Sequence, residues 1–154
     1  MLSMAEINLN EFEVFDAENK ILGRLSSVVA KNLLSGKNVA VINAEKAVIS
    51  GNKKVILAKY KTRLRLMEKE NPEHSPYWPR RSDMLVKRII RGMLPYNRPR
   101  GKTAYRKLRV FLGVPPAFKD AKIAKIESKD PNKMYVNHIT IAELSRLLGY
   151  GDNE

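Results

Sequence analysis

Cysteine is missing from this sequence of 154 residues, and histidine occurs only twice, as His74 and His138. Without thiols the chain can form neither disulfide bonds nor thiolate zinc sites, and it has no cysteine nucleophile. The two histidines lie far apart, without an HExxH motif or the neighbours of a catalytic triad, so we interpret both as structural or surface residues. We therefore expect no metal site.

Long apolar runs are also missing. No uninterrupted stretch approaches the ~18 apolar residues that would suggest a membrane span. The first twelve residues have no basic segment and no apolar run of signal-peptide length, and they include Glu6 and Glu11. We therefore expect a soluble chain that is not exported and does not bind a membrane.

The glycine motifs of nucleotide-binding enzymes are incomplete. Gly101-Lys102-Thr103 resembles the end of a phosphate-binding P-loop, but the full motif needs glycine where Tyr96 stands. Gly23 has no partner glycines at the spacing of a dinucleotide-binding motif. No pair of carboxylates stands out as catalytic. The sequence therefore favours a protein that is not an enzyme and that has no cofactor and no small-molecule substrate.

Acidic residues are scarce between positions 80 and 109, where Asp83 is the single acid among eleven basic residues. The formal net charge of the chain is +13, so most of the excess lies in this one segment. Arginine outnumbers lysine there, and guanidinium groups bind phosphate in a planar, bidentate way and can stack on bases. This composition favours RNA over an anionic membrane surface, although a merely solvated helix face is the simpler alternative. The basic residues are Arg80, Arg81, Lys87, Arg88, Arg91, Arg98, Arg100, Lys102, Arg106, Lys107 and Arg109.

Aromatic rings flank these arginines in two loops. Tyr77 and Trp78 precede Arg80, and Tyr96 and Asn97 precede Arg98. Rings beside arginines can serve as stacking platforms for unpaired bases, although each ring alone is more often a packing residue. We add these four residues to the predicted RNA-binding set, with Trp78 as the best single candidate.

Apolar periodicity predicts an alternation of strands and helices. Continuous or alternating apolar runs indicate strands at 12–16, 39–42, 47–49 and 110–112, and spacings of three and four indicate helices between them. Because parallel strands need crossover connections, this order predicts a parallel sheet covered by helices, an α/β fold. We expect helices at about 22–33, 52–67, 82–93 and 103–108, and a last one beginning at 140.

Several residues are placed to begin or end these helices. Asn52 and Ser82 are expected N-caps, Thr140 with Glu143 matches a capping box, and Gly36 and Gly149 are expected to close helices in the left-handed conformation. Loops are expected at 71–79, which is rich in proline, and at 96–102, which is basic. We expect residues 1–116 to form the RNA-binding domain and 117–154 to be a C-terminal extension that packs on it or acts as an arm.

Three motifs occur in a fixed order along the chain. They are Asp16-Ala17 with Leu22-Gly23-Arg24-Leu25, then Val41-Ile42-Asn43-Ala44-Glu45 with Ser50-Gly51-Asn52-Lys53, and last Arg91-Gly92-Met93-Leu94-Pro95 with Gly101 and Arg106-Lys107-Leu108-Arg109-Val110-Phe111-Leu112-Gly113. This combination resembles the thirteenth large-subunit ribosomal protein family. The Tyr77-Trp78-Pro79-Arg80-Arg81 loop and Val114-Pro115-Pro116 are similar to its archaeal and eukaryotic branch.

The resemblance implies a three-layer α/β/α sandwich with a parallel, mainly four-stranded sheet. It also implies a cytoplasmic constituent of the large ribosomal subunit that binds large-subunit rRNA, contacts neighbouring ribosomal proteins, and supports subunit assembly and translation. The family's RNA-contacting region corresponds to Arg91 through Arg109 and the loop before it. Two alternatives stay open: an RNA-processing or nucleotide-binding enzyme, and a regulator that binds messenger RNA outside the ribosome.

Overall fold

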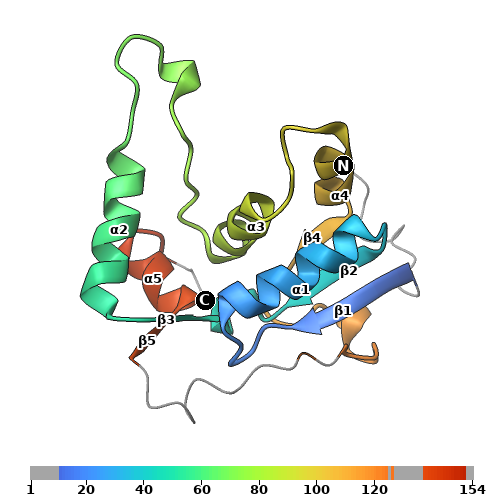
Figure 1. Cartoon of the computed structure of the whole chain (residues 1–154). Helices are drawn as coiled ribbons and strands as arrows, with labels where there is room; N and C mark the ends of the chain where they lie inside the picture. Colours follow the sequence, from blue (N-terminus) through green and yellow to red (C-terminus); the bar gives the residue numbers. More distant parts are fainter. Residues whose placement is uncertain (1–10, 125, 127–136, 152–154) are drawn as a thin grey trace.

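The computed structural model describes residues 11–124, 126 and 137–151. Figure 1 shows the arrangement of the helices and strands in these ranges. In chain order they are β1 (Phe12–Asp16), α1 (Leu22–Leu34), β2 (Asn38–Ile42), β3 (Val48–Ser50), α2 (Lys53–Arg65), α3 (Ser82–Gly92), α4 (Pro99–Arg106), β4 (Leu108–Val110), β5 (His138–Thr140) and α5 (Ile141–Leu147).

A parallel sheet in the strand order β1-β2-β4 forms the centre of the fold. Phe15 pairs with Val41, and Val41 pairs with Val110. Because side chains alternate across a strand, these residues point to the same face, where they pack against α1 and α3. The predicted apolar stripe of α1 is buried as expected, at Leu22, Leu25, Val29 and Leu33. The α/β class and the parallel pairing are therefore confirmed.

The four-stranded sheet is not confirmed. The predicted strand at 47–49 exists as β3, but it pairs antiparallel with β5 in a separate small sheet. Only five residues join β2 to β3, and they include Asn43 in the left-handed conformation and the short 3₁₀ turn Ala44–Lys46. A parallel neighbour would need a long crossover, so β3 takes a partner from elsewhere in the chain. Beside β1, the described residues add only a single parallel bridge between Val14 and Ile123.

The third layer of the expected sandwich is not confirmed either. The second face of the sheet presents Val14, Ala40 and Ile42, which pack with Phe118. Phe118 belongs to a short 3₁₀ turn, Pro116–Phe118, and no α-helix contributes to this cluster in the described part of the chain. The described residues thus place their helices on one face of the parallel sheet.

The C-terminal helix α5 packs into the fold. Ile141 joins the core beneath α1 and α3, whereas Leu144 and Leu148 pack with Ile139 and with Ile56 of α2. Residues 125, 127–136 and 152–154 of the predicted C-terminal extension lie outside the described residues. None of the helices in the described ranges combines the length and apolarity needed to cross a bilayer.

The predicted helix caps have mixed outcomes. The side chain of Asn52 accepts a hydrogen bond from the backbone of Lys54, and that of Thr140 accepts one from Glu143, so both caps are confirmed. Gly36 and Gly149 have positive φ angles and close α1 and α5 as predicted. The Ser82 cap is wrong, because Arg81 is the N-cap residue and Ser82 is the buried first residue of α3.

Three element boundaries also differ from the prediction. Helix α4 begins at Pro99, within the predicted basic loop, because proline is favoured in the first turn of a helix. A Cβ atom at Gly101 would overlap the carbonyl group of Pro95, so glycine allows this close packing. β4 ends at Val110 instead of beginning there. α2 ends at Arg65, two residues before the predicted end at 67, and Met67 is exposed.

Candidate nucleic-acid interface

Helix α3 positions the centre of the predicted RNA-binding set. Leu85, Val86 and Ile90 are buried on its inner face. Arg88 and Arg91 lie three residues apart and remain partly exposed, as does Lys87. The helical repeat thus separates an apolar side that fixes α3 on the sheet from a cationic side that is open to ligands.

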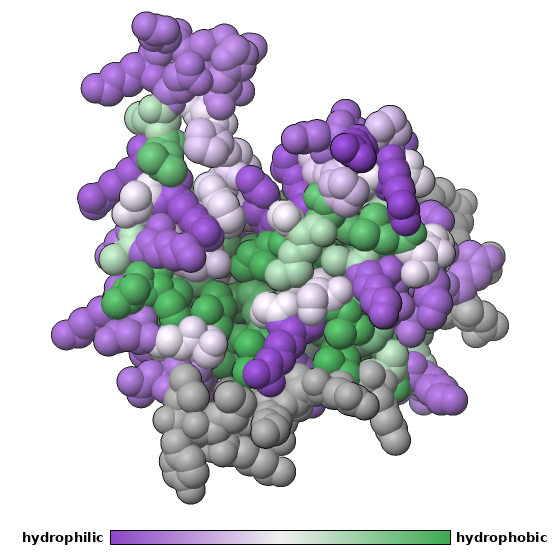
Figure 2. All heavy atoms as spheres, viewed as in Figure 1, coloured by the Kyte–Doolittle hydropathy of each residue, from purple (hydrophilic) through white to green (hydrophobic). Residues whose placement is uncertain are grey.

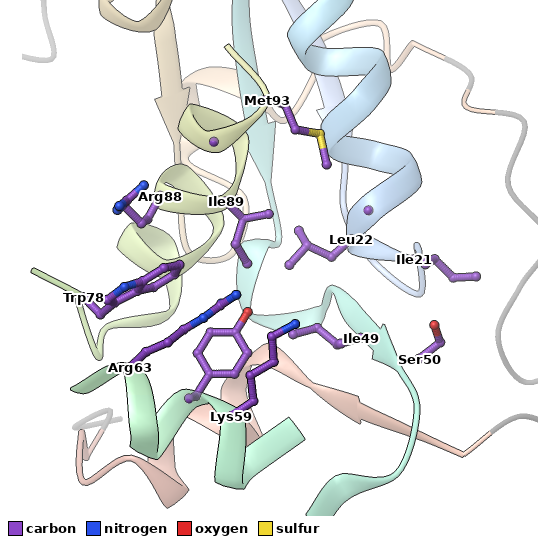
Figure 3. Close-up of a pocket in the computed structure, with 13 residues that line it drawn as sticks. Ile21, Leu22, Ile49, Ser50, Lys59, Arg63, Trp78, Arg88, Ile89 and Met93 are labelled. Carbon is purple, nitrogen blue, oxygen red and sulfur yellow. The ribbon is translucent and has the colours of Figure 1, made fainter. Parts of the chain in front are cut away.

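Trp78 lies between two arginines. The guanidinium carbon of Arg63 is 4.3 Å from the centre of the indole ring, and that of Arg88 is 4.7 Å from it. Figure 3 shows the two side chains on either side of the ring. Tyr60 meets the indole edge-on at a centroid distance of 6.0 Å. In this arrangement Trp78 orients cations, and its ring faces are occupied by the protein itself.

Arg63 was not part of the predicted set. It belongs to α2, outside the basic segment, and its role depends on the approach of α2 to the loop at 71–79. The sequence does hold one signal, since Lys59 and Arg63 are four residues apart and so lie on one face of the helix. Arg63 also lies 5.0 Å from the ring centre of Tyr60, which is buried in α2 together with Ile56.

A second aromatic cluster joins α3 to α4. Arg91 lies 3.9 Å from the ring centre of Tyr96, and Tyr96 meets Tyr105 edge-on at 5.4 Å. The ammonium group of Lys87 lies 5.2 Å from the ring centre of Tyr105. Cation–π contacts of this kind hold long basic side chains in place without neutralising them. The sequence predicted Tyr96, Arg91 and Lys87 but not Tyr105.

Several predicted residues have partners within the protein. Lys107 donates a hydrogen bond of 2.7 Å to the carbonyl of Gly36, and Arg100 donates one of 3.3 Å to the carbonyl of Leu34. Both cations lie at the C-terminal end of α1, where the helix dipole favours positive charge.

Two further predicted residues have partners close to them in the sequence. Arg81 forms an ion pair of 2.9 Å with Asp83. Arg109 donates to the carbonyl of Arg106 at 3.2 Å.

The remaining predicted residues are all exposed. Tyr77 is 80% exposed. The others in this group, all exposed, are Arg80, Asn97, Arg98, Lys102 and Arg106. The loop with Tyr77 and the helix α3 line a shared hollow of 360 Å³, and Arg98 lines a second hollow of 370 Å³ with Arg88 and Arg91. The fold therefore brings both predicted loops to α3.

Burial and like charge act together on two of these cations. Burial lowers the pKa of Lys87 below its ordinary value, and the nearby Arg109 lowers it further. Burial also lowers the pKa of Arg88, with added repulsion from Arg91 and Arg63. The Nε of Arg88 is buried without a hydrogen-bond partner among the described residues. An anion bound here would relieve the repulsion and supply hydrogen-bond acceptors.

Residues 11–124, 126 and 137–151 hold no group of three or more side chains suited to binding a metal ion. On the face drawn in Figure 2, a band of hydrophobic residues crosses the middle, and hydrophilic residues lie above it and at its sides.

Comparison with known proteins is consistent with the motifs. The family model described as "Ribosomal protein L13" matches residues 10–117. A protein of Archaeoglobus fulgidus named "Large ribosomal subunit protein uL13" is 44% identical over 92% of this chain and 90% of its own length. A protein of the same name from Methanopyrus kandleri is 40% identical over 94% of this chain and 91% of its own length. Another, from Sulfurisphaera tokodaii, is 42% identical over 88% of this chain and 93% of its own length.

Proposed function

Because the chain belongs to the ribosomal protein L13 family, we propose that it binds large-subunit rRNA through the cationic surface of α3, α4 and their loops. The family consists of structural components of the large ribosomal subunit, so the chain has a structural ribosomal role and is not an enzyme. This agrees with the sequence, in which the motifs of nucleotide-binding enzymes are incomplete. The archaeal relatives also agree with the predicted branch. In this proposal the chain resides in the cytoplasm, within the subunit, and contacts neighbouring ribosomal proteins there.

One observation carries the proposal: arginines gathered from separate segments are held by aromatic rings around α3. Arg88 and Arg91 are each stacked on a ring, and both line hollows with the exposed loop residues. A stacked guanidinium has fewer conformations to lose when it binds, so it binds phosphate at a lower entropic cost. The surface thus favours a rigid, structured polyanion.

The proposed mechanism is non-catalytic. The sheet and α1 form a platform, and Lys107 and Arg100 tie α4 to the end of α1. The exposed cations then neutralise phosphates where RNA segments come close together, which releases condensed counterions. By lowering the repulsion between RNA segments, the bound protein supports subunit assembly.

The salt dependence of RNA binding tests this proposal. We would replace the exposed Arg98, Lys102 and Arg106 with glutamine and measure filter binding to the large-subunit rRNA of Archaeoglobus fulgidus over a salt series. Each lost phosphate contact should reduce the magnitude of the slope of log affinity against log salt concentration by roughly 0.7 to 0.9. The slope of the triple variant should therefore be smaller in magnitude by about 2 or more. An unchanged slope and affinity would contradict the proposal.

A matched control uses three exposed lysines outside the basic segment, Lys31, Lys54 and Lys61, also replaced with glutamine. This variant loses the same net charge, and its slope should change by less than about 1. Sedimentation of ribosomes then separates a resident of the subunit from a regulator of messenger RNA. A resident should migrate with the large subunit through moderate salt.

A further inference from the structure

A hollow of 580 Å³ lies between α2, α3, β3 and the start of α1. Figure 3 shows its walls, to which α1, β3, α2, α3 and the loop with Trp78 all contribute. Most of its cations and aromatic rings come from α2 and from the loop that follows it, and α2 lies outside the segment that the sequence marked as basic. Its volume falls within the range of about 300 to 1,000 Å³ that is typical of ligand sites.

The floor of the hollow is apolar. Leu22 of α1 and Ile89 of α3 point toward one another in Figure 3, and Ile49 and Met93 complete the surface. Met93 is 43% exposed, so part of this apolar surface is accessible to solvent. Covering this exposed apolar floor with a flat, weakly hydrated group is favourable, because apolar surface is then removed from water.

The rim of the hollow is cationic. Lys59, Arg63 and Arg88 line it, and no carboxylate is among the described residues that do so. Trp78 separates the two guanidinium groups and holds both, and the buried Nε of Arg88 has no hydrogen-bond partner within the described ranges. Charge complementarity therefore selects an anion at the rim.

An apolar floor beside a cationic rim matches the two halves of a nucleotide. The base can cover Ile49, Ile89 and Met93, while the phosphate lies near Lys59, Arg63 and Arg88. We propose that this hollow binds one unpaired nucleotide of structured RNA, with its base on the apolar floor and its phosphate at the rim. Bases displaced from their stack are the usual targets of proteins that read RNA.

This inference rests on the proposed function and deepens it, because it places an unstacked base at a defined position and extends the RNA-binding surface to α2. Trp78 then acts as a positioning residue: it orients Arg63 and Arg88 toward the phosphate and does not itself stack on a base. Base and phosphate would be bound by different elements, so the two halves of the site can be tested separately.

Photochemical crosslinking tests the site. The large-subunit rRNA of Archaeoglobus fulgidus, transcribed with sparse 4-thiouridine or 6-thioguanosine, would be bound to the full chain, irradiated and digested for mass spectrometry. We expect crosslinks at Met93 or neighbouring residues of the hollow, and we expect them to map to unpaired nucleotides. Crosslinks at 96–106 report on the proposed function and serve as an internal reference.

Variants sharpen the experiment. Replacing Lys59 and Arg63 with glutamine should reduce crosslinks in the hollow by roughly tenfold and leave those at 96–106 in place, since a charge-assisted hydrogen bond is lost at the rim. The control replaces Lys54 and Lys61 of the same helix with glutamine, and it should leave both sets unchanged. Circular dichroism confirms that each variant is folded.

Several outcomes would overturn the inference. Crosslinks at 96–106 without any in the hollow would leave the proposed function standing and reject the nucleotide site. Crosslinks from base-paired nucleotides, or full protection of the hollow by free adenosine monophosphate at micromolar concentration, would reject an unpaired RNA nucleotide as its occupant. The absence of both sets of crosslinks would count against the proposed function as well.

Discussion

Trp78 shows how a single residue organises the basic surface. Its ring contacts Arg63 from α2 and Arg88 from α3, and it packs edge-on against Tyr60. A cation–π contact contributes about 0.5 to 1 kcal/mol at an exposed site, and an aromatic pair contributes a similar amount. The residue therefore couples the loop at 71–79 to two helices.

Replacement of Trp78 with alanine should lower the free energy of unfolding by about 2 to 3 kcal/mol, because apolar burial is lost together with the ring contacts. Urea denaturation of the free protein measures this change. Trp78→Phe is the matched control, and it should lose at most half of the free energy of unfolding that Trp78→Ala loses, since it keeps a flat ring. If Trp78→Ala is as stable as the parent, the stacked arrangement contributes nothing.

Lys87 shows the cost of placing a cation on a partly buried helix face. Burial, and then Arg109, lowers the pKa of Lys87 in the folded protein. Since the unfolded chain binds the proton more tightly, stability from this group rises with pH between the lowered pKa and the ordinary value of about 10.5. Below the lowered pKa the charged group opposes folding.

Replacement of Lys87 with methionine should therefore stabilise the free protein at neutral pH and flatten the rise in stability toward pH 10.5. The difference in unfolding free energy between variant and parent, measured in urea from pH 7 to pH 10.5, isolates this residue. Lys87→Arg keeps the charge and should remain destabilised at every pH in that range. A variant that is less stable than the parent at pH 7 would contradict this account.

At the scale of elements, the start of a helix depends on which polar group reaches its free backbone N–H groups. Asn52 accepts a hydrogen bond of 3.0 Å from the backbone of Lys54 at the start of α2. Ser82 begins α3, yet its hydroxyl is buried without a partner in the described part of the chain. Asparagine and serine are both favoured at helix N-caps, but of these two residues only Asn52 acts as a cap.

Asn52→Ala should cost about 1 kcal/mol of stability, the usual effect of losing an N-cap. Ser82→Ala should be neutral or stabilising, because it removes a buried hydroxyl that has no hydrogen bond. Urea denaturation of both variants provides an internal comparison. A larger loss for Ser82→Ala than for Asn52→Ala would reverse this assignment.

At the scale of the whole molecule, the C-terminal segment contributes to every described core cluster. Phe118 covers the second face of the sheet, Ile141 lies beneath α1 and α3, and Leu144 and Leu148 pack near α2. Burying one large apolar side chain contributes about 1.5 to 3 kcal/mol. The predicted division into residues 1–116 and 117–154 is therefore tested by asking whether residues 1–116 are stable on their own.

A chain that ends at residue 116 loses all these buried side chains and the partner of β3. Because native domains are stable by only about 5 to 15 kcal/mol, we expect the shortened chain not to fold cooperatively. Thermal and urea unfolding followed by circular dichroism measures this, with a chain ending at residue 151 as the control. Cooperative unfolding of residues 1–116 would instead establish them as an independent domain.

The sequence by itself determined the features that depend on local patterns. The apolar spacing of α1 and α3, the cap at Asn52, the left-handed glycines and the concentration of arginine between 80 and 109 are all readable from neighbouring residues. The family motifs are local as well, which is why they identified the family before the fold was known.

Tertiary structure alone decided which segments meet. The pairing of β3 with β5 joins residues about ninety positions apart, and the local sequence of neither strand predicts which strand it pairs with. The stacking of Arg63 on Trp78 likewise depends on the approach of α2 to a loop. The exposed side chains and those bound to α1, such as Lys107, have the same local composition. Composition sets the charge of the surface, whereas packing decides which charges remain available to a ligand.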